Sequence, residues 1–424
     1  MTYAFFSLAS HSLSEPEYGG ITLLWSAVFI TVSVLYRPVE QLLSRTIAHR
    51  DARGEAGSEH LRIAATIQLG LGLLFAVTAL ALRGPLQDDL FDGSDTLYWV
   101  LLVTVLAYAA SYFARGFLAG HHRFGLYGLL VLMEASSRCL FARAVAVGIA
   151  DGQDVVALGM VAAPVVSLAV VPWALRARFR AQQSAVSNQL SATATAEAQF
   201  TLSHGAGFAS AVLVVMLAEQ TFLNAGPLIV KAGEGGAEGA ALAGFTFNVL
   251  LIARAPLQLF QSVQTAILPV LTRLRASGET DPFRRSISLT LLAIALFAGA
   301  AALVMLAAGP AIMGLVFGGD FDYDRGGLVL IAAGMGFYLG AATLNQAALA
   351  RGHARQAAAC WASAALGFVL FLALVSFDDR VLQVEAAYLG GALVLFGMLY
   401  VLYTRDEPAT AVSNAPSTTP QPPS

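Results

Sequence analysis

The stretch FLAGHHRFG at Phe117–Gly125 ends one apolar run and leads into the next, and ALARGHARQ at Ala348–Gln356 does the same much later in the chain. The Gly-His pair that begins at Gly120 recurs at Gly352, with an Arg close behind in both places, at an offset of 352 − 120 = 232 residues. A polar turn that recurs between two long apolar runs indicates that a helical unit has been duplicated.

The composition is that of a membrane protein. Of 424 residues, 57% are hydrophobic and only 12% are charged, about half the charge of a soluble protein. Runs of about 18 or more apolar residues, each long enough to cross roughly 30 Å of hydrocarbon, follow one another. We expect an all-α polytopic bundle of about twelve spans rather than a β-barrel, whose strands would alternate in shorter segments. The expected spans are a short one at Thr2–Leu13, then Ile21–Leu43, Leu61–Leu82, Thr96–Ala119, Phe124–Ile149, Val155–Leu175, Phe200–Val230, Ala240–Leu268, Ile287–Ala308, Gly326–Ala350, Gln356–Phe377 and Val384–Tyr403.

The basic residues are divided unevenly between the two sets of alternate loops. Fifteen of them fall in one set, and only Arg83, Lys231, Arg325 and Arg380 fall in the other. By the positive-inside rule the first set faces the cytoplasm. We therefore expect the C-terminus, and with twelve spans also the N-terminus, in the cytoplasm.

Two further matches support the duplication. GPLQDDLFDG at Gly84–Gly93 matches GPAIMGLVFG at Gly309–Gly318 with an offset of 309 − 84 = 225, and Pro38 matches Pro256 with an offset of 256 − 38 = 218. An even number of spans per unit keeps both units in the same orientation. We expect two parallel six-helix lobes, related by a pseudo-two-fold axis along the membrane normal, with a site between them.

The lobes are expected at residues 1–183 and 200–405. Residues 184–199 are polar and rich in Ser, Thr and Ala, which predicts a cytoplasmic linker, and residues 406–424, with five Pro and no aromatic residue, predict a disordered cytoplasmic tail. The first span covers about 18 Å, roughly half a bilayer, whereas its counterpart in the second lobe is longer. The sequence therefore predicts a natural start upstream of Met1.

Eight charged residues lie inside the expected spans, where an arginine alone costs at least about 2.5–3.5 kcal/mol. They are Arg37, Glu40, Arg115, Glu134, Arg138, Arg143, Glu219 and Arg254. Glu134 and Arg138 are four residues apart and can pair on one helix face. Glu40 follows Arg37 by three residues and can neutralise it.

Four of these charges have no such partner close by on their own helix, and one of them, Arg254, is considered below. Arg115 and Arg143 lie nearer the ends of their spans, so each can extend its guanidinium to the membrane interface. Glu219 has no basic neighbour on its own helix. It either pairs with an arginine across the interface or carries a coupling proton, and both interpretations stay open.

The sequence carries no sign of an enzyme. Cys139 and Cys360 lie inside apolar spans, so neither a disulfide framework nor a cysteine metal site is indicated. No P-loop, H-E-x-x-H or G-x-S-x-G motif is present. The expected outer loops are also too short for the folded domain of a lipid-dependent glycosyltransferase. We expect no catalytic residue, metal, cofactor or nucleic acid partner.

Three stretches and the two-lobe pattern carry a resemblance to a known family. With SEPEYGG at Ser14–Gly20, ILPVLTRLRASGE at Ile267–Glu279 and LVFGGDF at Leu315–Phe321, the chain resembles the multidrug/oligosaccharidyl-lipid/polysaccharide (MOP) exporter superfamily. It looks most like the bacterial polysaccharide-type flippases, and departs from them in its short first span. The resemblance implies a flippase of the bacterial inner membrane that moves a polyprenyl-pyrophosphate-linked oligosaccharide to the outer leaflet for envelope polysaccharide biosynthesis. It also implies a lipid-linked glycan and membrane lipid as partners, and is compatible with glycosyltransferases or a polymerase of the same pathway.

Two arginines are expected to bind that pyrophosphate. Arg37 and Arg254 each precede one of the recurring prolines, so the duplication places them at related positions of the two lobes. A proline within a span is tolerated mainly where the helix borders protein or water. Because a guanidinium binds phosphate oxygens in pairs, we predict that Arg37 and Arg254, with help from Arg138, hold the pyrophosphate. The resemblance points to the same residues, since related lipid flippases use cavity arginines on these helices.

Three alternatives stay open. Arg37 can instead pair with Glu40, and Arg254 with Glu219, in a purely structural arrangement. A cation-coupled drug antiporter of the same superfamily would favour a cavity lined mainly by acids and aromatics, whereas arginines outnumber acids five to three inside the spans. A non-transporting scaffold of an envelope-assembly complex is also compatible with the sequence.

Overall fold

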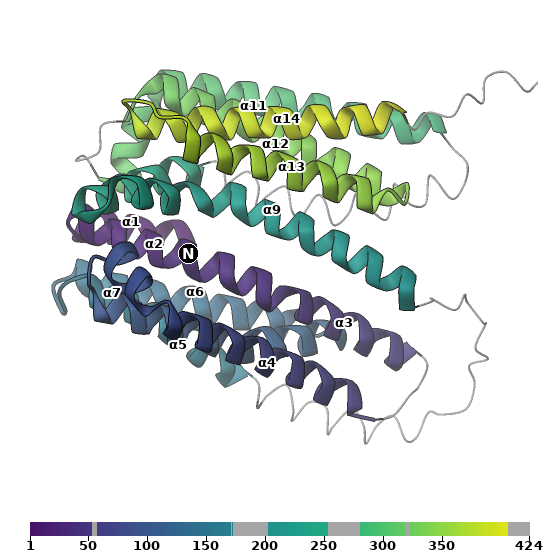
Figure 1. The fold of residues 1–424 in the computed structure, drawn as a ribbon, viewed down its shortest axis with the longest axis horizontal. Coiled ribbons are helices and arrows are strands. Elements are labelled where there is room, and N and C mark those ends of the chain that lie inside the picture. Colours follow the sequence, from purple (N-terminus) through teal and green to yellow (C-terminus); the bar gives the residue numbers. More distant parts are fainter. Residues whose placement is uncertain (53–56, 171, 173–201, 253–279, 319–322, 406–424) are drawn as a thin grey trace, which may run out of the picture.

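The computed structural model describes residues 1–52, 57–170, 172, 202–252, 280–318 and 323–405. Within these ranges the chain forms helices and no strands, which confirms the all-α prediction. The helices form two lobes, an N-terminal lobe drawn in purple to blue and a C-terminal lobe drawn in teal to yellow (Figure 1). Arg254 and the predicted linker and tail lie outside the described residues.

The N-terminal lobe begins with a short helix, as expected, and continues with a long rod made of two helices in succession. Pro38 stands in the first turn of the second of these, where its missing N–H is least costly. The elements are α1 (Thr2–Ser12), α2 (Glu15–Leu35), α3 (Arg37–Ala52), α4 (Glu59–Ala81), η1 (Pro85–Leu90), α5 (Asp95–Gly120), α6 (Phe124–Ala146), α7 (Gln153–Ser167) and η2 (Leu168–Val170).

The C-terminal lobe is also a bundle of long helices. Its elements are α9 (Leu202–Glu234), an apolar helix at Gly236–Ile252, α11 (Thr280–Phe317), α12 (Arg325–Ala350), α13 (Ala354–Leu374) and α14 (Arg380–Arg405). Across the described residues of both lobes, nine helices are long and apolar enough to cross a membrane. The chain is therefore a polytopic transmembrane bundle, as predicted.

One predicted span is longer than expected. The sequence predicts Ile287–Ala308, but α11 continues through Pro310 to Phe317. Proline is tolerated inside membrane helices when neighbouring groups satisfy the freed carbonyl, and the residues that follow Pro310 are apolar. The matching stretch of the N-terminal lobe carries aspartates instead, and there the chain leaves the helix through η1.

The duplication is visible in one pair of helices. α5 and α12 both contain 26 residues, and their starts differ by 325 − 95 = 230. The residue before each start caps the helix in the same way, because the Ser94 hydroxyl accepts the Leu97 N–H at 3.2 Å and an Asp324 carboxylate oxygen accepts the Gly327 N–H at 2.9 Å. The two helices are therefore equivalent elements of the two lobes.

The register of the opening motif needs a correction. The predicted offset was 232, but the turns after α5 and α12 superpose at 230, since the residues with positive φ are His122 (55°) and Gly352 (82°). The backbone hydrogen bonds agree: the Arg123 N–H donates to the Leu118 carbonyl and the His353 N–H to the Ala348 carbonyl, both at 2.9 Å. The residue with positive φ that ends each helix determines where the turn lies. The alignment of the two Gly-His pairs is therefore shifted by two residues from the structural equivalence.

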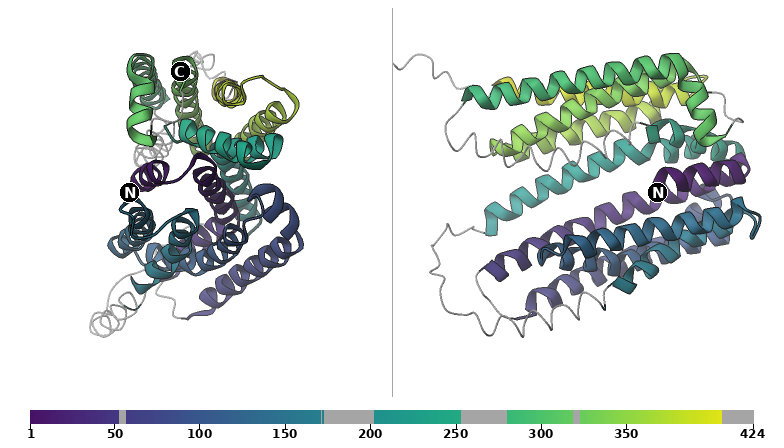
Figure 2. Two further views of the ribbon diagram at one scale, coloured as in Figure 1. Left: turned by 90° about the vertical axis from the view of Figure 1, so that its left-hand side faces the viewer. Right: turned by 180° about the vertical axis from the view of Figure 1, so that it is seen from behind.

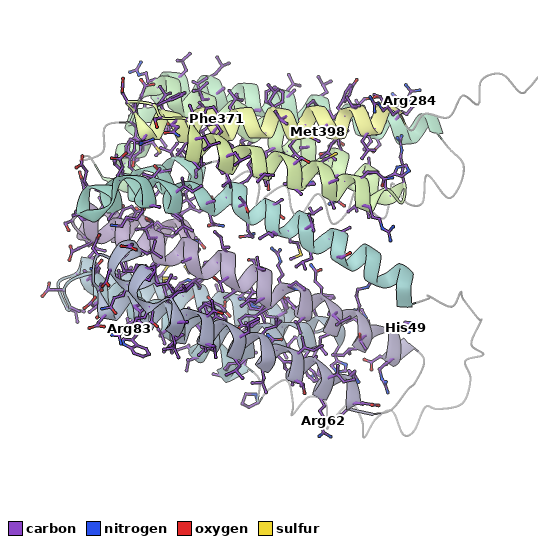
Figure 3. All side chains as sticks on the ribbon, in the orientation of Figure 1. His49, Arg62, Arg83, Arg284, Phe371 and Met398 are labelled. Atoms are coloured by element: carbon purple, nitrogen blue, oxygen red, sulfur yellow. The ribbon has the colours of Figure 1, made fainter. Side chains whose placement is uncertain are left out.

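The two ends of the bundle differ in charge. His49, Arg62 and Arg284 lie at one end, and Arg83 lies at the other (Figure 3). We call the first the basic end. We call the second the acidic end because, although Arg83 lies there, the loops at that end carry most of the aspartates, among them Asp92. The lobes adjoin at the acidic end, and their ribbons diverge toward the basic end, where α3 and the start of α9 lie apart (Figures 1 and 2).

Candidate functional site

The site begins with a close approach of α3 to α5. A Cβ atom on Gly116 would lie 2.9 Å from the Glu40 carbonyl oxygen, and one on Gly120 would lie 2.7 Å from the Ile47 Cβ. Only glycine permits this contact between the two helices. As a result, the Glu40 side chain is held against α5 and α6, deep in the N-terminal lobe.

Glu134 of α6 is the centre of a buried polar network. Its side chain is 2% exposed, and it forms an ion pair with Arg115 of α5. The carboxylate also accepts hydrogen bonds from the hydroxyls of Ser111 at 2.5 Å and Ser167 at 3.3 Å. Such a pair is stable at membrane depth only when further hydrogen bonds satisfy its remaining oxygens.

Two predictions about these charges were wrong. Glu134 does not pair with Arg138, because the neighbouring helix presents Arg115 to the carboxylate instead. Arg115 does not extend to the interface either, since its guanidinium is held by Glu134 and lies 4.6 Å from the centre of the Tyr112 ring. Arg143 is exposed in the last turn of α6, where it is free to reach the interface.

Arg138 is a buried cation held mainly by aromatic groups. Its side chain is 6% exposed, and its guanidinium lies 5.2 Å from the Trp25 ring centre and 5.9 Å from that of Phe29. It donates a 2.7 Å hydrogen bond to the Tyr108 hydroxyl. No carboxylate of the described residues lies within 4.0 Å of it. Cation–π contacts therefore replace a counter-ion here.

Arg37 is half-buried at the start of α3 and is not paired with Glu40. The Glu40 carboxylate accepts a 3.1 Å hydrogen bond from the Tyr127 hydroxyl, because the close packing of α3 on α5 turns it toward α6. Within the part of the chain that the structure describes, no carboxylate is within 4.0 Å of Arg37. The alternative in which Arg37 pairs with Glu40 is therefore not found.

Glu219 is half-buried on α9 of the other lobe. Arg37 is the charged group that acts on it across the interface, although the two are not within the 4.0 Å of an ion pair. Its predicted pairing with Arg254 lies outside the described residues. The charges of Arg37 and Glu219 thus interact between the lobes without forming an ion pair.

We call Arg37, Glu40, Arg115, Glu134 and Arg138 the charge cluster. It contains three guanidinium groups and two carboxylates. At the offset of 230, three of its positions can be compared with the C-terminal lobe, namely Arg115 with Asn345, Glu134 with Ala364 and Arg138 with Phe368. Ala364 and Phe368 are buried in an apolar core, so the fold does not need charge at these positions.

Sequence reasoning found the charged members of this cluster but not their hydroxyl partners. Tyr108, Ser111, Tyr127 and Ser167 all lie inside apolar spans, where a buried hydroxyl must find a hydrogen-bond partner. This requirement could have identified these hydroxyls as hydrogen-bond partners of the buried charges. As for metals, the described ranges contain no group of three or more His, Cys, Asp or Glu side chains that could hold an ion.

Comparison with known proteins gives a fold but no relative by sequence. No family model matches the chain, and no curated protein matches it. A solved multidrug resistance MATE family transporter of the MOP superfamily, in an inward-facing conformation, is similar over 95% of this chain and 93% of its own, with 13% identity and a TM-score of 0.69. The chain shares the fold of this transporter.

Two other solved structures share this fold. The lipid II flippase MurJ in an inward closed conformation is similar over 95% of this chain and 85% of its own, with 10% identity and a TM-score of 0.60. A mutant of a Vibrio cholerae MATE transporter is similar over 95% and 94%, with 15% identity and a TM-score of 0.57. In this fold the charge cluster lies in the N-terminal lobe, and the charge of Arg37 acts on Glu219 of the other lobe.

Proposed function

We propose that the chain is a flippase that moves a polyprenyl-pyrophosphate-linked oligosaccharide from the inner to the outer leaflet of a bacterial inner membrane by alternating access. The observation that carries this proposal is that two guanidinium groups of the charge cluster, those of Arg37 and Arg138, have no carboxylate within 4.0 Å among the described residues. The charge of Arg37 acts across the interface on Glu219 of the other lobe. A site with that charge suits an anionic cargo.

The chemistry of the cargo fits the residues available. A pyrophosphate presents several anionic oxygens, and the planar guanidinium binds them in pairs. The polyprenyl chain stays in lipid while the charged head group crosses between the lobes. Arg37 supplies the exposed part of the site, Arg254 is its proposed counterpart from the duplication, and Arg138 adds positive charge from behind the aromatic groups.

The comparison between the lobes supports a functional origin of the charges. The C-terminal lobe packs Ala364 and Phe368 at the places of Glu134 and Arg138, and an apolar core there is less costly at membrane depth than an ion pair. Charges that the fold does not require are retained at a cost. Binding of a charged cargo, directly or by positioning Arg37, explains that cost.

A second candidate is a cation-coupled antiporter of drugs or other small molecules. It is favoured by Glu219, whose half-buried carboxylate has no described basic group within 4.0 Å, and by the likeness to a multidrug resistance transporter. Such a protein would bind a cation at Glu219 and would not depend on the guanidinium geometry of Arg37. A scaffold of an envelope-assembly complex would move neither cargo.

The test compares two arginine variants in proteoliposomes that contain a fluorescent polyprenyl-pyrophosphate-linked sugar. Arg37→Lys keeps the charge but loses the paired hydrogen bonds, so we expect the rate of lipid translocation to fall at least about tenfold. Arg143→Lys, at an exposed position at the end of α6, is the matched control and is expected to leave the rate unchanged. Equal rates in the wild type and Arg37→Lys would contradict the proposal.

A further inference from the structure

The lobes are joined at the acidic end by an ion pair that crosses between them. Lys231, near the end of α9, is fully buried, and its ammonium donates to the Asp92 carboxylate at 2.5 Å. It also donates to the Gly236 carbonyl at 2.7 Å. Asp92 belongs to the loop between η1 and α5, so one partner comes from each lobe.

A second connection lies beside the first and consists of neutral groups. The Tyr18 hydroxyl of α2 donates to the Asn248 side-chain oxygen, and the Asn248 amide donates to the Tyr323 hydroxyl at 3.1 Å. All three side chains are buried. Burial raises the pKa of Tyr323, and the Asn248 hydrogen bond lowers it only in part, so the hydroxyl stays neutral.

The backbones also meet here more closely than side chains would allow. A Cβ atom on Gly19 of α2 would lie 1.9 Å from the Ala240 carbonyl oxygen, and one on Gly244 would lie 3.2 Å from the Gly19 Cα. The rings of Phe6 and Phe247 pack beside this contact with 4.6 Å between their centres. The acidic end is therefore held by close backbone and ring packing in addition to the ion pair and the hydrogen bonds.

We propose that the Asp92–Lys231 pair and the Tyr18–Asn248–Tyr323 chain form a latch that holds the lobes together at the acidic end, and that breaking it limits the opening of that end. The inference rests on the lobes moving relative to each other, as the proposed function requires. These contacts bridge the lobes directly, so opening must separate them.

The cost of opening comes mainly from Lys231. A buried ammonium that loses its carboxylate is strongly unfavourable unless water replaces it. A cavity of about 270 Å³ next to the pair is lined by Asp92, Ser94 and Gln153 from the N-terminal lobe and by Ala237 and Ala240 from the other. Water in this cavity can reach the Asp92 carboxylate, so the separated charges can be hydrated as the lobes part.

The test measures the distance between the lobes at the acidic end by pulsed electron–electron double resonance between two spin labels. Spin labels replace the exposed residues Asp89 and Glu238, one on each lobe, in a chain without its two native cysteines. Asp92→Asn removes the charge while keeping a residue that tolerates the positive φ of this position. We expect the ratio of separated to joined lobes to rise at least about tenfold.

The matched control breaks a salt bridge that stays within one lobe at the same end. Asp95→Asn removes the 2.9 Å contact with Arg83, in which both side chains are exposed. We expect its distance distribution to match that of the parent chain. A folded Asp92→Asn variant with the same distribution as Asp95→Asn would overturn the proposal.

A second variant decides the question even if Asp92→Asn fails to fold. Tyr18→Phe removes only the hydroxyl of the neutral connection, and Tyr98→Phe is its control, since the Tyr98 hydroxyl donates within the N-terminal lobe to the Ala79 carbonyl at 3.1 Å. We expect more separated lobes in Tyr18→Phe than in Tyr98→Phe. Equal distributions in these two variants would overturn the latch.

The distances require no substrate, so the two proposals can fail separately. If no lipid pyrophosphate is moved but the latch variants separate the lobes, the flippase assignment is wrong and the latch stands. If transport depends on Arg37 but neither latch variant changes the distances, the latch is wrong and the flippase stands.

Discussion

Arg115 and Glu134 depend on each other at the residue scale, because the Glu134 side chain is 2% exposed and that of Arg115 only 13%. Glu134→Gln leaves the Arg115 guanidinium without its counter-ion, and we expect it to lower the free energy of unfolding by about 3 kcal/mol. Chemical unfolding in detergent measures this. Glu59→Gln, at the exposed start of α4, is the control and should change little. A loss no larger than that of the control would show that the pair is not needed for stability.

The same residues show how far sequence reasoning reaches at this scale. It identified which charges lie inside the membrane, because hydropathy and burial follow composition. It did not predict their partners, since spacing along one helix favours Arg138 for Glu134, whereas the packing of α5 on α6 supplies Arg115. Pairing between helices depends on tertiary contacts that a single sequence does not display.

At the scale of elements, the contact between α2 and the helix at Gly236–Ile252 depends on Gly19. An Ala side chain there would meet the Ala240 carbonyl, so we expect Gly19→Ala to lower the free energy of unfolding by about 1–3 kcal/mol. Gly70→Ala is the control, because a Cβ atom at this position would have nothing within 4 Å. We expect this substitution to stabilise α4 by about 0.5–1 kcal/mol. Thermal unfolding compares the two variants, and a neutral Gly19→Ala would contradict the close approach.

The helices themselves were largely predictable, and their ends were not. Long apolar runs predicted the helical bundle and the order of its helices along the chain, because hydrocarbon thickness sets their length. The continuation of α3 past the apolar run to Ala52 and of α11 to Phe317 came from packing and from local charge. The two-residue difference between the predicted and the observed offset of the repeat reflects the positive φ of His122. A comparison of residue types does not detect that backbone conformation.

At the scale of the whole molecule, the distribution of charge predicts which end faces the cytoplasm. His49 lies at the basic end and Asp89 at the acidic end. In a chain without native cysteines, we expect a membrane-impermeant maleimide added to intact cells to label an Asp89→Cys variant and not a His49→Cys variant. Labelling of His49→Cys alone would invert the topology and place the joined end of the lobes inside the cell.

The central claim is that the protein selects an anionic lipid cargo, and a comparison of cargoes tests it most directly. Proteoliposomes carry one of three probes, namely a polyprenyl-pyrophosphate-linked sugar, the same sugar joined to polyprenol without phosphate, or a lipophilic cation. Translocation is measured against protein-free vesicles. We predict movement of the pyrophosphate lipid, and background rates for the other two, because Arg37 and its cluster favour negative charge. Movement of the cation with no movement of the pyrophosphate lipid would contradict the account and favour the antiporter.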